Sequence, residues 1–145
     1  MKEDLGCIHC KKCTKNCNFL NKYNMDLEDF SNRIDLAYNC FLCGRCKEVC
    51  PKDIDGKEIA LSMRREHIKK HNNILKDKDY SLLLKEKNAY KFANYKNSNK
   101  KSVLFPGCNF ISFYPTTIKH LITILKEYDI GAIFDCCQKP IDELG

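Results

Sequence analysis

The sequence predicts an α+β protein, in which a helical N-terminal part is followed by a partial βαβ segment. Apolar residues between positions 27 and 68 recur at helical spacing. Two short apolar runs, 102–105 and 130–134, instead flank a helical stretch that begins near Pro115. A strand, a helix and a second strand form a βαβ unit, which requires two parallel strands.

The expected elements fall into three parts. In residues 1–71, one helical stripe is formed by Leu27, Phe30, Ile34 and Ala37. A second helix begins near Lys57, and its buried side carries Ile59, Ala60, Met63 and Ile68. Residues 72–101 form a Lys- and Asn-rich helical connector, with a helix at 80–84 against the first part and a linker at 94–101. Residues 102–145 hold the βαβ segment.

Length and composition limit the class of protein. The 145 residues suit one domain or two small ones, and eleven of them are Cys. No apolar run approaches the ~18 residues of a membrane helix, and the N-terminus lacks the apolar region of a secretory signal. We therefore expect a cytoplasmic protein, in which cysteines are more often metal ligands than disulfide partners.

The net charge of +6 is concentrated in one segment. Residues 69–101 hold ten Lys against three acids, whereas the parts before and after them are close to neutral. Such a segment is typical of a solvated surface or of a docking face for an acidic partner. Nucleic-acid binding is not expected, since no binding motif accompanies the charge.

One cysteine motif occurs twice. The spacing C-x2-C-x2-C-x3-C is formed first by Cys7, Cys10, Cys13 and Cys17, and again by Cys40, Cys43, Cys46 and Cys50. This is the run of two-cluster bacterial ferredoxins, in which the fourth Cys of each quartet serves the other cluster. The spacing therefore predicts two [4Fe–4S] clusters, one held by Cys7, Cys10, Cys13 and Cys50, the other by Cys40, Cys43, Cys46 and Cys17.

Two other uses of the eight cysteines fit the sequence less well. Zinc sites usually take pairs of C-x2-C, which two identical quartets fit poorly. A disulfide framework is not expected in a cytoplasmic chain. His9 lies within the first quartet, where all ligand positions are already filled, so we expect it to be a neighbour of the cluster.

Residues 7 to about 70 resemble the α-helical ferredoxin domain of succinate dehydrogenase iron–sulfur subunits and of the two-cluster subunit of heterodisulfide reductase. The resemblance rests on the quartets, on the helical pattern between them, and on the run CFLCGRCKEVCP at 40–51. Asn18 stands where the first quartet would often have Pro.

Three further cysteines follow the two predicted strands. Cys108 comes after Pro106-Gly107, and Cys136-Cys137 closes the second strand. Both groups would emerge at the carboxyl edge of a parallel pair, where ligand sites lie in αβ units. The alternative is that these three cysteines are buried small apolar residues.

The stretches FPGC at 105–108, Tyr114-Pro115 and CCQKP at 136–140 resemble the start of a cysteine-rich CCG domain. Such domains occur in the cysteine-rich subunit of heterodisulfide reductase and in the iron–sulfur subunits of glycolate oxidase and anaerobic glycerol-3-phosphate dehydrogenase. Gln138 replaces the Gly of CCG, and no further C-x-x-C follows before Gly145. We therefore expect a fragment, a truncated gene product or one piece of a split protein. Cys108, Cys136 and Cys137 are candidate ligands of a third metal site only if another segment supplies the rest.

These observations predict an electron-transfer subunit of a heterodisulfide-reductase-like oxidoreductase that is not catalytic alone. No acid–base or nucleophilic constellation is visible apart from the cysteines, so the clusters would carry the chemistry. The expected partners are a flavoprotein or iron–sulfur redox subunit, and a separate chain that completes the CCG domain. The alternatives are a freestanding ferredoxin-type carrier and a non-redox interaction protein stapled by metal.

Overall fold

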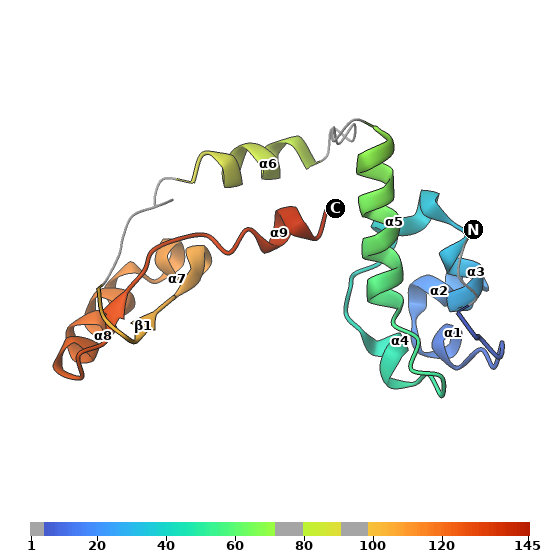
Figure 1. Ribbon diagram of the computed structural model, residues 1–145, viewed down its shortest axis with the longest axis horizontal. Helices are drawn as coiled ribbons and strands as arrows, with labels where there is room; N and C mark the ends of the chain where they lie inside the picture. The colour runs from blue at the N-terminus through green and yellow to red at the C-terminus, as the bar shows by residue number, and fades with distance from the viewer. Residues whose placement is uncertain (1–4, 72–79, 91–98) are drawn as a thin grey trace. The chain divides into compact units, whose positions relative to one another are not determined.

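The computed structural model describes residues 5–71, 80–90 and 99–145 (Figure 1). They form two compact units. The first comprises residues 5–71 together with 142–145, and the second comprises 80–90 together with 99–141. The predicted α+β class is confirmed, because helices dominate and one small parallel sheet is present. No helix among the described residues has the length and apolar character needed to cross a membrane.

The secondary-structure elements among the described residues of the first unit are all helices, joined by loops. Its elements are α1 (Lys12–Asn16), α2 (Asn18–Lys22), α3 (Leu27–Ser31), the 3₁₀ helix η1 (Ile34–Asn39), α4 (Arg45–Glu48) and α5 (Gly56–Lys70). The predicted stripe at 27–37 is divided between α3 and η1, because the chain leaves the helix at Asn32 and Arg33. The helix expected near Lys57 is confirmed as α5, which Asp55 caps through the N–H groups of Lys57 and Glu58.

A small apolar core joins these short helices. Phe30, Leu20 and Leu27 are its most deeply buried large side chains. Ala60 and Met63 of α5 belong to the same core. Six of the eight quartet cysteines belong to this core or pack against it, namely Cys7, Cys13, Cys17, Cys40, Cys46 and Cys50. The core therefore fixes the position of the cysteine loops.

The second unit contains the predicted βαβ arrangement. Strand β1 (Val103–Leu104) pairs in parallel with β2 (Gly131–Ala132), with Val103 opposite Gly131 and Leu104 opposite Ala132. The connecting helix α8 (Pro115–Glu127) has Pro115 at its start, as expected. Both strands are only two residues long, and an additional helix, α7 (Gly107–Phe113), follows β1 directly. A last helix, α9, spans Lys139–Asp142.

The helix expected at 80–84 is present as α6 (Ser81–Asn88). We expected it to pack against the first part, but it belongs to the second unit, where Lys87 approaches Cys108. Most of the linker expected at 94–101 lies outside the described residues, which resume at residue 99.

Candidate metal centre

The repeated cysteine spacing is accompanied by a repeated backbone conformation. His9 and Leu42, each two residues after the first Cys of its quartet, have positive φ of 51° and 56°. Lys11 and Gly44, each one residue after the second Cys, have φ of 57° and 77°. A short helix starts directly after each of the latter two, α1 after Lys11 and α4 after Gly44. The two quartets are thus held in equivalent loops, and the left-handed turns persist even at three non-glycine residues.

One cavity gathers four cysteines from both quartets. It has a volume of about 260 Å³, and its cysteine side chains are Cys17, Cys40, Cys43 and Cys46. Phe41, Arg45 and Lys57 also line it. The fourth Cys of the first quartet therefore lies with the first three of the second.

The other four cysteines line a second, narrower cavity. They are Cys7, Cys10, Cys13 and Cys50. The volume here is about 10 Å³, enough for about one water molecule. Lys11, Asp26 and Lys52 are the charged residues of this cavity. Each quartet thus exchanges its last cysteine with the other, as the spacing predicts for cluster ligands.

The surroundings of the thiols fit clusters held by thiolates. The N–H of His9 donates to Cys7 Sγ, and the N–H of Leu42 donates to Cys40 Sγ, each at 3.4 Å. Such donors orient metal-bound sulfur and favour its negative charge. The fit is tight around Cys46, since a β-carbon added at Gly56 would come within 2.6 Å of its Sγ atom.

A helix N-terminus faces the third cysteine of each quartet. Burial raises the pKa of the Cys13 thiol, and the N–H of Leu27, at the start of α3, acts in the opposite direction. Burial likewise raises the pKa of the Cys46 thiol, opposed by the N–H of Gly56 at the start of α5. Binding of a metal must therefore offset the cost of forming buried thiolates, and these N–H groups lower that cost.

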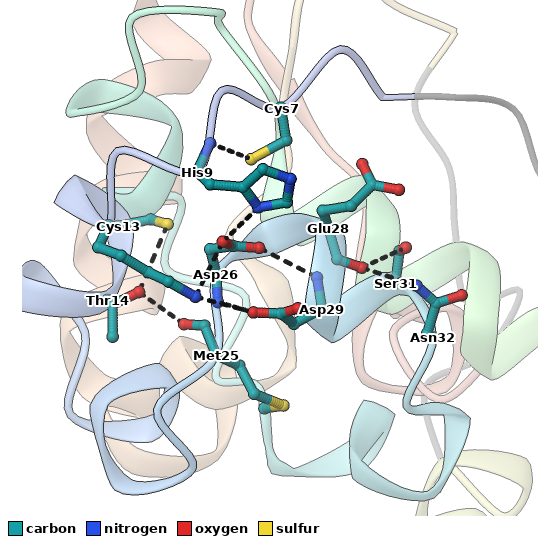
Figure 2. Close-up of polar contacts among 11 residues, drawn as sticks. Cys7, His9, Cys13, Thr14, Met25, Asp26, Glu28, Asp29, Ser31 and Asn32 are labelled. Atoms are coloured by element: carbon teal, nitrogen blue, oxygen red, sulfur yellow. Dashed lines mark hydrogen bonds and ion pairs between the residues drawn. The ribbon is translucent and has the colours of Figure 1, made fainter.

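A charged network supports the first quartet (Figure 2). Asp26 is fully buried, and its Oδ2 atom lies 2.9 Å from both His9 Nδ1 and Lys11 Nζ. Lys11 Nζ is also 2.9 Å from Asp29 Oδ2, and Asp26 and Asp29 form a reciprocal capping box at the start of α3. Burial alone would raise the pKa of Asp26. This pKa is instead held well below its usual value by the N–H of Asp29 and by the side chains of His9 and Lys11. The network ties the loop around Cys10 to α3.

His9 stays a neighbour of the first quartet in this arrangement. Donor atoms of Cys7, His9 and Asp26 lie within 4.8 Å of one another, a group that could hold a metal ion. The imidazole is instead hydrogen-bonded to Asp26, which raises the pKa of His9. The four thiols of the cavity already make a complete donor set without it.

Arg64 of α5 contacts the backbone at the start of the second quartet. It is 6% exposed, and its guanidinium donates to the carbonyl oxygens of Ala37 and Cys40. Burial raises the pKa of the Cys40 thiol, and the Leu42 N–H and the Arg64 charge act against that rise.

The second unit brings two of its three cysteines together. Cys108 lies in the first turn of α7 after β1, Cys136 follows β2, and their thiols are close enough for Cys108 to raise the pKa of Cys136. Burial and the neighbouring Cys108 raise the pKa of Cys136, and the N–H of Gln138 opposes this. Cys136 is buried and Cys137 is exposed. Lys87 of α6, 7% exposed, places its Nζ atom 4.0 Å from Cys108 Sγ.

Sequence reasoning missed three residues of these sites. Asp26 could have been found from its place directly before α3 with an acid three residues on, which is the pattern of a capping box. Arg64 follows the buried Ala60 by four residues and so falls on the apolar stripe of α5. Lys87 carries no such signal, since it stands among many lysines.

Comparison with known proteins agrees with the cysteine geometry. Residues 6–54 match the family model of the 4Fe-4S dicluster domain. This segment, which holds both cysteine quartets, is therefore similar to a 4Fe-4S dicluster domain. No solved structure matches the chain.

Two curated relatives extend the similarity beyond this domain. An uncharacterized iron-sulfur protein of Methanococcus maripaludis is 27% identical over 185 aligned positions, which span 100% of this chain and 37% of that protein. An uncharacterized iron-sulfur protein of Methanocaldococcus jannaschii is 25% identical over 185 positions, spanning 99% of this chain and 37% of that protein. The chain thus spans little more than a third of the length of these relatives.

Proposed function

We propose that the chain relays electrons, one at a time, through two [4Fe–4S] clusters. Cys7, Cys10, Cys13 and Cys50 would hold one cluster and Cys17, Cys40, Cys43 and Cys46 the other. The observation that carries this proposal is the exchange of the fourth cysteine between the two cavities. A [4Fe–4S] cluster supplies one-electron chemistry when bound, and its potential depends on charge, hydrogen bonds and exposure.

The residues of the chain would bind, orient and tune these centres. The left-handed turns at His9, Lys11, Leu42 and Gly44 shape the two loops. The backbone N–H groups of His9 and Leu42 face thiols and stabilise negative charge there. Cys10 and Cys43 are exposed, so each centre has an edge accessible to a redox partner.

The wider proposal places the chain in a cytoplasmic, heterodisulfide-reductase-like oxidoreductase. A flavoprotein or another iron–sulfur subunit would exchange electrons with the clusters. Cys108, Cys136 and Cys137 would be part of a third, CCG-type site, which another segment or chain completes. The neighbouring thiols of Cys108 and Cys136 support this, as does the buried Lys87 cation beside them. Exposed aromatic side chains on the second unit, such as Phe113 at 75%, fit a surface that other protein covers.

A freestanding ferredoxin-type carrier is the second candidate. The two cavities alone are sufficient for such a carrier, and the second unit would then be scaffold. Co-purification with a flavoprotein would favour the subunit over the carrier. A metal-stapled interaction protein would contain zinc and be colourless.

Metal analysis tests the central proposal. Protein purified without oxygen should be brown, with about eight iron and about eight sulfide per chain, and reduction should give the electron paramagnetic resonance signals of [4Fe–4S]⁺ centres. A protein that contains only zinc, or four iron with full occupancy, would contradict the two-cluster proposal.

A further inference from the structure

The buried guanidinium of Arg64 has no carboxylate partner among the described residues. Its Nε donates to Ala37 O at 3.1 Å, its Nη2 to Cys40 O at 2.7 Å, and its Nη1 to Glu143 O at 2.5 Å. All three acceptors are backbone carbonyls within the first unit. These bonds satisfy the donors but leave the positive charge uncompensated.

An uncompensated buried charge is costly. Removing an ion from water costs several kcal/mol, and proteins usually offset that cost with an opposite charge. The Tyr38 ring, with its centroid 5.1 Å from Arg64 Cζ, supplies a weaker cation–π attraction. Among the described residues, Arg64 therefore lacks a negative group close by. A cluster bound by the thiolates of Cys40 and its three companions would supply one, since Arg64 already contacts the Cys40 carbonyl.

We propose that Arg64 is a buried counter-cation of the second cluster, in addition to Arg45 and Lys57, which line its cavity, and that it raises the reduction potential of this cluster. This inference rests on the proposed function, because it requires a cluster on Cys17, Cys40, Cys43 and Cys46. Arg64 is a positioning residue here: its Nη2 bond holds the backbone of Cys40, and its charge favours the reduced, more negative state of the centre.

The cations around the first cluster are placed differently. Lys11 and Lys52 line its cavity. Asp26 and Asp29 already pair with Lys11, so the field of this lysine at the first cluster is largely cancelled. Lys52 is exposed to solvent, where salt screens its charge. Because Arg64 is buried, salt screens its charge much less than that of a surface lysine.

The test compares Arg64→Gln with Arg64→Lys in the whole chain. Each protein is reconstituted without oxygen, its iron is counted, and its two clusters are titrated by electron paramagnetic resonance against a potential scale. Arg64→Gln should shift the potential of one cluster downward and leave the other unchanged. Arg64→Lys, which keeps the charge, should stay near the wild-type value. Arg65→Gln is the matched control, because Arg65 is half exposed and pairs with Asp142 at the surface.

Three outcomes would overturn the inference while leaving the two-cluster proposal intact. These are wild-type potentials in a fully loaded Arg64→Gln protein, an equal shift of both clusters, and a shift in Arg64→Lys as large as in Arg64→Gln. Wild-type protein without eight iron would instead overturn the proposed function and this inference together.

If Arg64→Gln does not fold, a measurement on the wild-type protein still tests the role of Arg64. The two clusters should titrate at separate potentials, and raising the salt from 0.1 M to 1 M should leave their separation unchanged, since Debye lengths of about 10 Å and 3 Å then apply. Coinciding potentials, or a separation that disappears in high salt, would refute a role for the buried cation.

Discussion

Gly56 and Cys46 lie so close that the glycine cannot carry a side chain without moving the thiol. A β-carbon at Gly56 would stand 2.6 Å from Cys46 Sγ and 2.7 Å from Leu27 Cδ2. The N–H of Gly56 also faces the same thiol at the N-terminus of α5. The start of this helix therefore approaches a candidate cysteine ligand closely, and the glycine in the sequence alone does not indicate this contact.

We predict that Gly56→Ala expels or loosens the second cluster. The added methyl group must displace Cys46 or Leu27, and overpacking of this kind costs about 1–3 kcal/mol. Iron should fall from about eight towards about four per chain, with the signal of one centre retained. Ser62→Ala, on an exposed position of α5, is the control. Full iron content in the Gly56→Ala protein would show that the cavity can widen.

Exchange of the fourth cysteine gives a second prediction. Cys17→Ser should damage the cluster of Cys40, Cys43 and Cys46, although Cys17 belongs to the first quartet in sequence. Resonance spectra of the reduced variant should lose the same component that Cys43→Ser loses, and keep the one that Cys10→Ser loses. Cys137→Ser, in the second unit, should change neither. A match between Cys17→Ser and Cys10→Ser would refute the exchange.

The spacing of residues in the sequence predicted the candidate site best where a single residue type, cysteine, supplies the candidate ligands. Eight cysteines at two identical spacings predicted which thiols the two cavities bring together. The start of α8 at Pro115 and the parallel strand pair were also predictable, since proline position and apolar period are local signals.

The supporting residues were not predictable, because their roles depend on tertiary contacts. Arg64 reaches carbonyl groups 24 and 27 residues earlier in the chain. Lys87 was expected in a solvated connector, yet it is buried beside Cys108, because α6 belongs to the second unit. Periodicity places a residue on a helix face but does not identify the segment that covers that face.

A third prediction concerns Asp26, the buried carboxylate of the network beside the first quartet. Asp26→Asn keeps the size of the side chain but removes its charge, so the bonds to Lys11 and His9 weaken. The cap of α3 can persist, because Asn and Asp cap helices about equally well. Loss of the charge-assisted bonds to Lys11 and His9 costs about 1–3 kcal/mol. The midpoint of urea unfolding, followed by cluster absorbance without oxygen, should fall accordingly. Asp35→Asn, whose exposed carboxylate pairs with Arg33, should leave the midpoint unchanged.

Removal of the metal should destabilise the first unit and leave the second unit folded. Six of the quartet cysteines belong to or pack against the core of the first unit, so loss of the clusters removes a large part of its stabilisation. The second unit contains none of the eight cysteines and has its own packing, in which Ile118 of α8 is buried. Hydrogen exchange on the apo chain should show lost protection in α1 to α5 and retained protection in α8.

Reconstitution provides the control for this last prediction. Adding iron and sulfide back without oxygen should restore protection in α5. Zinc alone should restore less, because a single ion bound to four thiolates at about 2.3 Å draws the sulfurs closer together than a four-iron cubane does. Equal loss of protection in α5 and α8 would contradict the independence of the units. Unchanged protection in α5 would mean that the apolar core around Phe30 folds the first unit without metal.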